Sequence, residues 1–458
     1  MKNLKRVFCL ILAVAMLVTL LSACGEKDKG GTTTLKNELF DEGYLDEDWL
    51  AEREKYEKDH PPYNVDEKLK GSKIVFATWI DPMTDESAYS WSTFEEKTGI
   101  KPEFILVGQG EYNTKIASLI ASDEAPDIFM ENMDTFPTSL NLVQPLNKIS
   151  TIDLNDPIWD KSMSEFGTFG GNTYFTNTKY TIWSGGDLVY YNKKALEDNG
   201  ILTPQDYIDA GEWTLENLFK IAREFKSVNP AHGGVGLEWR YLAAASGSAL
   251  AQIKDGKFVS GINDASMMDA LRMYYIGRDE GLTATNANKG LMAGTNAFVI
   301  VGAYGLKKTG YYKGMKDPEN LGFAPIPSID GKSENTFYSA IYRSYGICRG
   351  AKNPEGAGYF LRYYLDPLNY DYDEAFISED ARDFYLEYVS AVDAKDKVFD
   401  FTTSVANAIG YKGSDWRNSL QNSNGDQYTV ALQTISNEVQ AGVNAANKLI
   451  NDVIARDK

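Results

Sequence analysis

The chain has 458 residues, with 46 Lys or Arg against 65 Asp or Glu and a formal net charge of −19. Phosphate backbones repel a protein this acidic, so the composition disfavours nucleic-acid binding. At about 150 residues per domain, the length allows two or three lobes that each bury a core.

The first elements in chain order are a signal segment and an anchoring site. Basic residues near the start precede an uncharged run from Val7 to Leu21, whose 15 residues are too few for a membrane-spanning helix of about 20. The Leu-Ser-Ala-Cys that ends at Cys24 resembles the lipobox of bacterial lipoproteins, where the signal peptide is cut before the cysteine and the thiol receives a diacylglycerol. This resemblance implies that residues 1–23 are a lipoprotein signal peptide. An ordinary signal peptide with an unrelated cysteine is the alternative.

Lipidation at Cys24 implies a lipid-anchored protein on the outer face of the cell membrane. That face is the extracellular side in a Gram-positive organism and the periplasmic side in a Gram-negative one. With Cys9 removed and Cys24 lipidated, only Cys348 remains, which excludes a disulfide within the chain.

Residues 24–70 are predicted to be a lipid-anchored tether and an acidic stalk. A Gly/Lys/Thr-rich stretch is followed by a segment dense in acids, which closes at Pro61-Pro62. The pattern indicates one short exposed helix, with Asp46 at its cap and with Trp49 and Tyr56 available to dock it.

Strand and helix signals alternate after the stalk. Apolar, β-branched runs predict strands over 73–80, 101–108 and 126–130, and amphipathic patterns predict helices over 86–99 and 111–125. This order implies a largely parallel sheet covered by helices on both faces. Ligands on such sheets bind beyond the carboxyl ends of the strands.

Two later helices are also predicted. The first spans 265–281, with Asn263 or Asp264 as its cap and Gly281 at its end. The second is a long terminal helix, whose apolar face runs from Ile435 to Val453 at helical spacing.

Seven segments resemble a known family by their order and spacing. They are "FEEKTGIKPEF", "IASDEAPDIFMEN", "LVQPLNKI", "DLVYYNKKALEDNGI", "EWTLENLFKIAREF", "LMAGTNAFVIVGAYG" and "LGFAPIPSIDGKS". This order is similar to that of the sugar-type extracellular solute-binding proteins of ABC importers, which include maltodextrin-binding proteins. The likeness runs from about Lys73 to the C-terminus and does not cover the acidic stalk.

The resemblance implies an α/β, two-lobed periplasmic-binding-protein-like fold of type II, with the ligand cleft between the lobes. Lobe 1 would hold 71–181 plus 326–378, and lobe 2 would hold 182–325 plus 379–458. The implied function is capture of a sugar or oligosaccharide and its delivery to the transmembrane subunits of an ABC permease, without cofactor or metal.

Aromatic and polar residues at predicted strand ends are the candidate ligand contacts. A sugar offers an apolar face to a flat ring and hydroxyls to carboxylates, amides or Arg. The expected set is Trp79, Asp81, Glu131, Asp134, Trp183, Trp239, Arg240, Tyr304, Tyr338 and Trp416. Core packing is the competing explanation for each aromatic. Asp127 and Trp213 are expected to have structural roles.

Signatures of catalysis are scarce. His60 and His232 are the only histidines, and neither lies near a cysteine or in a His-x-x-x-His pair, so a zinc site or a His-based triad lacks parts. The chain is therefore expected not to be an enzyme. Three alternatives stay open: a carrier for a peptide, amino acid or polyamine, an extracellular carbohydrate-active hydrolase, and an envelope lipoprotein for adhesion or sensing.

Overall fold

The computed structural model describes residues 47–458, except 84–87, 133–134, 179–185, 285, 328, 330–337, 341–342, 370–374, 390–396 and 424–426. Two compact units are distinguished, Met1–Ala51 and Glu52–Lys458. All elements below belong to the second unit, except the start of helix α3 (Glu47–Asp59). Cys24 lies outside the described residues, so its lipidation stays a prediction.

The first lobe is built on a five-stranded sheet with the order β2-β1-β3-β14-β4. Its strands are β1 (Lys73–Thr78), β2 (Lys101–Leu106), β3 (Ile128–Asn132), β4 (Val143–Gln144) and β14 (Arg343–Cys348). β2 and β3 both pair with β1 in parallel, whereas β14 runs antiparallel to β3. The alternation of strands and helices predicted from the sequence is confirmed here, and β14 is added from far along the chain.

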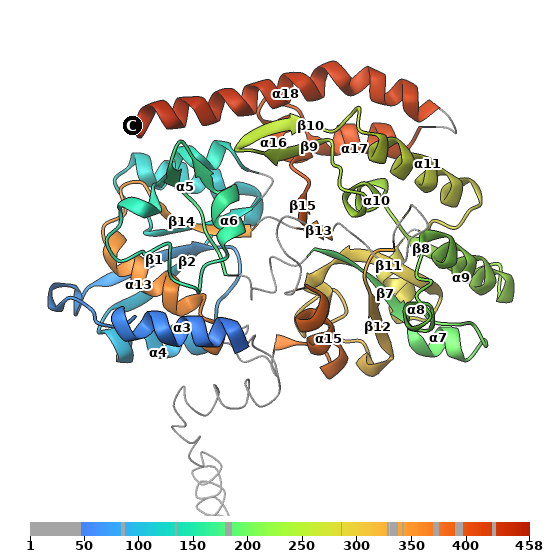
Figure 1. Ribbon diagram of the computed structural model, residues 1–458, viewed down its shortest axis with the longest axis horizontal. Coiled ribbons are helices and arrows are strands. Elements are labelled where there is room, and N and C mark those ends of the chain that lie inside the picture. The colour runs from blue at the N-terminus through green and yellow to red at the C-terminus, as the bar shows by residue number, and fades with distance from the viewer. Residues whose placement is uncertain are drawn as a thin grey trace, which may run out of the picture. The chain divides into compact units, whose positions relative to one another are not determined.

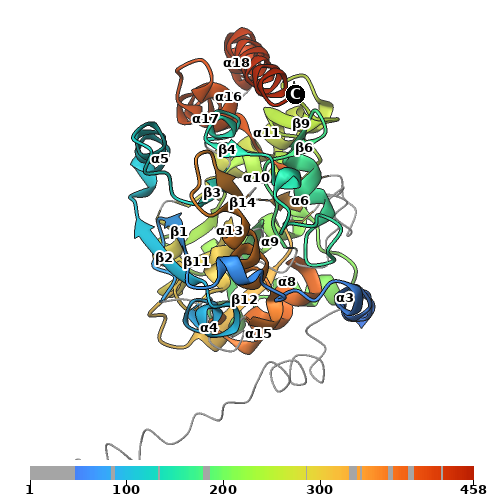
Figure 2. The same ribbon diagram turned by 90° about the vertical axis from the view of Figure 1, so that its left-hand side faces the viewer.

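Helices cover this sheet. Helices α4 (Ala88–Thr98) and α13 (Pro354–Tyr364) contact each other and the sheet, and α5 (Tyr112–Ala121) lies away from that pair in both views (Figures 1 and 2). The core on the α4 and α13 side is aromatic, because the Trp91 ring meets the Phe76 ring at 5.9 Å and the Phe360 ring at 4.8 Å.

The second lobe is built on a four-stranded sheet with the order β12-β7-β11-β8. Its strands are β7 (Asp187–Asn192), β8 (Gly233–Gly236), β11 (Asn296–Gly302) and β12 (Leu321–Ala324). All six residues of β7 are buried, as expected for a central strand with both faces covered. The four strands lie between residues 187 and 324, inside the range expected for lobe 2; the lobe boundaries themselves stay a prediction.

Helices surround the second sheet, and short elements complete both lobes. The helices are α7 (Lys193–Glu197), α8 (Pro204–Asp209), α9 (Leu215–Val228), α10 (Trp239–Ala245), α11 (Ala265–Asp279), α12 (Ala287–Met292) and α15 (Glu379–Phe384). The lobe 1 additions are α6 (Lys161–Phe166), β5 (Thr168–Phe169) and β6 (Asn172–Thr173). Trp213 is buried next to the cap of α9 and donates its Nε1 hydrogen to Pro325 O at 2.8 Å, in line with the structural role expected for it.

A third set of elements contacts both lobes. It comprises the hairpin β9 (Ala251–Lys254) and β10 (Lys257–Ser260), the pair β13 (Tyr338–Ala340) and β15 (Lys397–Phe399), and the helices α16 (Thr402–Asn407), α17 (Gly413–Gln421) and α18 (Tyr428–Arg456). Helix α18 runs beside β10, α16 and α17 (Figure 1). Its predicted apolar face is confirmed, since the residues at helical spacing from Ile435 to Val453 are buried.

A buried aromatic cluster joins this third set to lobe 1. The Phe136 ring of lobe 1 lies 5.9 Å from the Phe258 ring on β10 and 5.7 Å from the Phe401 ring. Phe169 of lobe 1 completes the cluster at 5.6 Å from Phe136. All four rings are buried. We call these four residues the phenylalanine seam.

The cap predicted for the helix over 265–281 is wrong in its chemistry. Asp264 stands at the N-cap position of α11, but its side chain makes no capping hydrogen bond. Its Oδ2 accepts instead from the Ser248 hydroxyl at 2.9 Å, which ties the helix start to the loop before β9. The predicted stop is confirmed, because Gly281 follows the helix with a φ of 67° that favours glycine.

The stalk helix is exposed along much of its length, as the sequence predicted, but one of its faces is buried. Arg53 of α3 is buried and forms two hydrogen bonds to the Asp366 carboxylate, at 2.6 and 2.5 Å. Glu57 accepts from Arg53 and from Arg362, each at 2.8 Å, and Arg362 also donates to Asp156 at 2.6 Å. These five residues, which we call the strap network, fix α3 to lobe 1. The expected docking by Tyr56 is confirmed, since its hydroxyl donates to Asp153 at 2.6 Å.

Candidate functional site

The strand register places the polar candidates at one edge of each sheet. In lobe 1, Arg343 at the start of β14 pairs with Asn132 at the end of β3, beside the end of β1. In lobe 2, Asp187 at the start of β7 pairs with Gly302 at the end of β11. The carboxyl ends of parallel strands are where α/β sheets bind ligands. These two edges therefore define the candidate site.

Trp79 lies directly after β1 and is half-buried. Its ring meets the Tyr112 ring edge to face at 4.8 Å, and the Arg343 guanidinium lies over it, 5.5 Å from the ring centre. Asp81, two residues further on, accepts from the backbone N–H of Met83 at 3.0 Å. The structure thus brings Trp79 together with an arginine that the sequence did not single out.

Glu131 is fully buried on β3, and its Oε1 accepts from the Thr135 hydroxyl at 2.8 Å. Thr135 follows the segment where Asp134 was expected to contact ligand. Asp134 itself lies outside the described residues. Asp127, at the start of the same strand, is buried and accepts from the N–H groups of Val75 at 2.8 Å and Asn353 at 2.7 Å, which is a structural role.

Tyr304 lies in the short turn after β11 and is half-buried. Its hydroxyl donates to Thr309 O at 2.6 Å, and its ring meets the Tyr311 ring at 5.2 Å and 88°. Gly305 is needed beside it, because a Cβ there would lie 2.8 Å from the Tyr190 ring. The glycine allows close packing below the turn, and the two tyrosine rings stand at the edge of the sheet.

Arg240 projects from the first turn of α10, beyond the end of β8. Its Nε donates to Glu238 at 2.6 Å, its Nη2 donates to the Tyr241 hydroxyl at 2.9 Å, and its guanidinium lies 4.4 Å from the Tyr241 ring centre. Burial raises the pKa of Tyr241, and the negative charge of Asp187 raises it further. These residues form a connected polar set at the lobe 2 edge.

Charged groups of both lobes act on Tyr311. Its side chain is 42% exposed, and partial burial together with the Asp187 carboxylate raises its pKa. The positive charges of Arg343 in lobe 1 and Arg240 in lobe 2 act in the opposite direction. Asp187, Arg240 and Arg343 therefore all lie close enough to Tyr311 to influence the ionisation of its hydroxyl.

The other candidates do not join this group. Trp239 and Trp416 are each 1% exposed and pack in the core, where Trp416 donates to Glu438 at 2.8 Å and Trp239 to Arg417 O at 3.5 Å. Trp183 lies outside the described residues. Tyr338 belongs to β13, and its side chain is not described.

Sequence reasoning missed four members of the site: Asp187, Glu238, Tyr311 and Arg343. Signals for two of them were present. Glu238 stands beside the chosen Trp239 and Arg240, and Tyr311 belongs to a Tyr-Tyr pair between glycines. Arg343 carried no local signal, because its importance depends on a ring from a distant segment.

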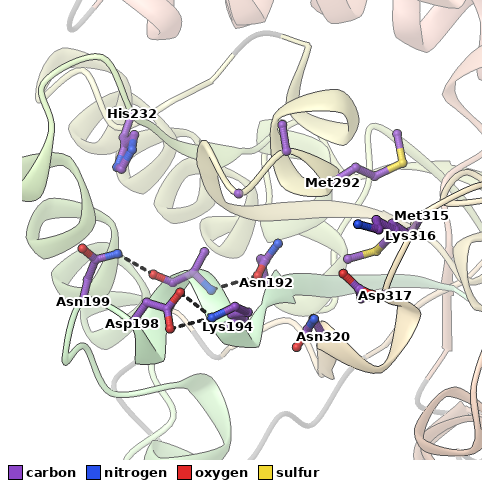
Figure 3. Close-up of a pocket in the computed structure, with 13 residues that line it drawn as sticks. Asn192, Lys194, Asp198, Asn199, His232, Met292, Met315, Lys316, Asp317 and Asn320 are labelled. Atoms are coloured by element: carbon purple, nitrogen blue, oxygen red, sulfur yellow. Dashed lines mark hydrogen bonds and ion pairs between the residues drawn. The ribbon is translucent and has the colours of Figure 1, made fainter.

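A separate hollow of about 430 Å³ lies at the edge of the lobe 2 sheet opposite to the candidate site (Figure 3). At this edge, Asn192 at the end of β7 pairs with Leu321 at the start of β12. Its polar groups bond to one another: Lys194 contacts Asp198 at 2.7 and 2.8 Å, and Asn199 donates to Ala195 O at 2.7 Å. Because this hollow is at the far end of the sheet from Tyr304, it is not part of the candidate site.

Metal and membrane features were also sought in the described part of the chain. There, no group of three or more His, Cys, Asp and Glu side chains could hold a metal ion. No helix within that part is both long and apolar enough to cross a membrane.

Comparisons with known proteins agree with this architecture. The family model described as bacterial extracellular solute-binding protein matches residues 70–369. No curated protein matches the chain.

Solved structures share the fold at low sequence identity. The galacto-N-biose-/lacto-N-biose I-binding protein of an ABC transporter from Bifidobacterium longum, in complex with lacto-N-biose, is 12% identical with a TM-score of 0.59, over 84% of this chain and 99% of that one. The cyclic alpha-maltosyl-1,6-maltose binding protein from Arthrobacter globiformis is 14% identical with a TM-score of 0.59, over 84% and 100%. An extracellular solute-binding protein from Staphylococcus aureus, in complex with maltose, is 13% identical with a TM-score of 0.59, over 81% and 98%.

Proposed function

Because the chain belongs to the bacterial extracellular solute-binding proteins, we propose that it captures a saccharide between its two lobes and delivers it to the membrane permease of an ABC transporter. The observation that carries this proposal is the pairing of partly exposed aromatic rings with fixed polar groups at the sheet edge of lobe 2. Tyr304 and Tyr311 offer rings, and Arg240 with Glu238 offers donors and acceptors. Rings suit the apolar face of a sugar, and the polar groups suit its hydroxyls.

The similar structures support the same ligand class. They include binding proteins in complex with lacto-N-biose and with maltose. A carrier for a peptide, amino acid or polyamine is not favoured by these neighbours, nor is a hydrolase.

The ligand contacts and the lobe limits are part of the proposal. We assign Trp79, Asp81, Arg240 and Tyr304 to the ligand side of the cleft, and we keep Asp134, Glu131, Trp183 and Tyr338 as contacts inferred from sequence. Trp239 and Trp416 are buried and would support the site through core packing, without touching the ligand. The lobes would comprise 71–181 plus 326–378, and 182–325 plus 379–458.

A thermal-shift screen of residues 25–458 tests the function. Neutral mono- and oligosaccharides are compared with amino acids, short peptides and polyamines. A ligand at 100 times its Kd should stabilise the folded state by about 2.7 kcal/mol, which raises the melting temperature measurably. A shift with saccharides alone supports the proposal. A shift with amino acids, peptides or polyamines alone, or with no compound, would contradict it.

Anchoring through Cys24 is a further part of the proposal, and it has its own test. Replacing Cys24 by Ser should abolish lipidation and release the protein from the cell surface, because the thioether bond to the lipid requires the sulfur. Incorporation of labelled palmitate into the wild-type chain and the Cys24→Ser chain measures this. Equal labelling of the two chains would refute the assignment.

A further inference from the structure

Arg343 occupies an unusual position for a residue outside every recognised motif. It starts β14, pairs with Asn132 across the sheet, and its guanidinium lies 5.5 Å from the centre of the Trp79 ring. Such a distance permits a cation–π interaction. One face of Trp79, the ring expected to stack on a sugar, is thus covered by a side chain of the protein itself.

The ring beneath Arg343 is itself held rigidly. Tyr112 packs edge to face against Trp79 at 4.8 Å, and the Tyr112 hydroxyl donates to Ala77 O at 2.7 Å and accepts from the Met130 N–H at 3.0 Å. Tyr112 is 3% exposed. A buried tyrosine tied to two neighbouring strands cannot turn without breaking both bonds, so Trp79 has a fixed support.

The backbone of Arg343 is fixed from another direction. Asn177, which is fully buried, donates its Nδ2 hydrogen to Arg343 O at 2.8 Å. Strand pairing with β3 restrains the same residue. The backbone of Arg343 and the Trp79 ring under its guanidinium are therefore both restrained. Such preorganisation lowers the loss of conformational entropy when a ligand binds.

We propose that Arg343 is the ligand-reading residue of lobe 1 and that Trp79 positions it, with the guanidinium donating a forked pair of hydrogen bonds to adjacent hydroxyls of a neutral sugar. This inference rests on the proposed function and assigns a contact that no motif indicated. It also changes the expected role of Trp79 from a sugar platform to a support for Arg343.

The polar groups named at the two edges suit the hydroxyls of a neutral sugar. Among the described residues at the two edges, the carboxylates are Asp81, Glu131, Asp187 and Glu238, and the guanidinium groups are Arg240 and Arg343. Arg240 already pairs with Glu238 at 2.6 Å. Sugar hydroxyls can donate to carboxylates and accept from Arg343. Arg343 also lies close enough to Tyr311 of lobe 2 to act on the pKa of its hydroxyl, which its positive charge lowers.

Calorimetric titration of five chains with maltose, lacto-N-biose and cellobiose tests the inference. The chains are wild type, Arg343→Met, Arg343→Lys, Trp79→Phe and the double variant Trp79→Phe/Arg343→Met. We expect Arg343→Met to weaken binding of the preferred sugar at least tenfold. Arg343→Lys should lose nearly as much, because an ammonium keeps the charge but not the planar fork. The double variant should bind no more weakly than Arg343→Met alone, because Trp79 acts through Arg343.

Arg349→Met is the matched control. Arg349 follows the other end of β14 and pairs with Asp457 at 2.7 Å, away from the site. This change should leave sugar affinity unaltered. It removes the ion pair with Asp457, so melting curves of all ligand-free chains are measured in parallel.

The possible outcomes are distinct. If the wild-type chain binds none of these sugars or of the wider screen, the proposed function fails, and this inference fails with it. If the wild type binds and Arg343→Met binds equally well, only this inference is overturned. Wild-type affinity in Arg343→Lys would reduce the role of Arg343 to its charge and contradict the forked contact. If the losses of binding free energy in the two single variants add up in the double variant, Trp79 contacts the sugar independently of Arg343. That outcome would contradict its positioning role.

Discussion

Tyr304 is held in place by its own loop rather than by the core. Its hydroxyl bonds to Thr309 O, and its ring contacts Tyr311, which is 42% exposed. The Tyr304 side chain is itself only half-buried. A substitution here should therefore separate ligand binding from stability.

We expect Tyr304→Ala to weaken saccharide binding by about 1–2 kcal/mol, or roughly five- to thirty-fold, by analogy with the energies of aromatic pairs. The melting temperature of the ligand-free chain should stay nearly unchanged. Titration calorimetry and melting curves measure the two effects. Normal affinity combined with a large loss of stability would place Tyr304 among the core aromatics.

Trp416 provides the opposite case. It is buried, it donates to Glu438, and it packs beneath α18, where a Cβ on Gly442 would lie 3.4 Å from its ring. Trp416→Ala should reduce the free energy of unfolding by about 3–5 kcal/mol through the cavity it leaves. Chemical denaturation measures this loss. A stable Trp416→Ala chain with impaired sugar binding would restore the role expected from its sequence.

At the scale of elements, the strap network ties α3 to lobe 1 through charges with little access to water. Arg53 and Arg362 are buried beside Asp156 and Asp366. Burial alone would raise the pKa of Asp366, but the charges and hydrogen bonds of Arg53 and Arg362 lower it. Removing one partner from such a group leaves another charge buried without compensation.

Arg53→Met should therefore destabilise the protein by about 3–5 kcal/mol. Replacing Arg53 and Asp366 together by apolar residues should cost less than the single change, because no uncompensated carboxylate remains. Arg272→Met is the control, since Arg272 forms an exposed pair with Asp269 at 3.3 Å, and such pairs contribute at most about 1 kcal/mol. Urea denaturation of the three variants checks these expectations. Similar small losses in Arg53→Met and Arg272→Met would contradict a structural role for the strap network.

The C-terminal end of α18 is latched to lobe 1 through Asp457. This carboxylate accepts from Arg456, from Arg349 at 2.7 Å and from the Tyr174 hydroxyl at 2.9 Å, and these bonds lower its pKa although burial opposes them. A carboxyl whose pKa is lowered by folding contributes stability above its unfolded pKa, about 3.9, and that contribution is lost as the pH falls toward its native pKa.

Asp457→Asn should thus lower the free energy of unfolding at pH 7 by about 1.5–3 kcal/mol, the range for hydrogen bonds to charged groups. The difference between wild type and variant should shrink as the pH is lowered from 4 toward 2. Asp452→Asn is the control, because Asp452 pairs with Lys448 on the exposed side of the same helix. A difference that stays constant with pH would mean that the Asp457 charge does not carry the effect.

Local patterns predicted the elements well and their partners poorly. The spacing of apolar residues placed β1, α5 and α18 because periodicity is a property of neighbouring residues. The cap of α11 was mistaken because Asp264 found a partner, Ser248, in another segment. The site was predicted in part for the same reason: Tyr304 was marked by glycines beside it, whereas Arg343 depends on Trp79, which the fold brings to it from the first strand.

The whole molecule combines a site between two sheet edges with elements that contact both lobes. The phenylalanine seam and the latch of α18 connect the third set of elements to lobe 1 without using the site residues. Ligand contacts with both edges would favour a closed arrangement of the two lobes. We expect the lobes to rotate while the phenylalanine seam and the latch of α18 stay intact.

Small-angle scattering should therefore show a smaller radius of gyration with a saturating sugar than without it. Tyr304→Ala, studied at the same sugar concentration, is the control for incomplete binding. An unchanged radius with verified saturation would contradict closure on the ligand.

Because of the strap network, the folded body and the range matched by the family model do not begin at the same residue. The family model matches residues 70–369, but Arg53 and Glu57 lie before that range and balance the charges of Asp366 and Arg362 within it. A chain that begins at residue 70 would keep Asp366 and Arg362 but lose Arg53 and Glu57, the groups that bond to them. The folded body therefore begins before the range that the family model matches, and residues 52–69 are part of that body.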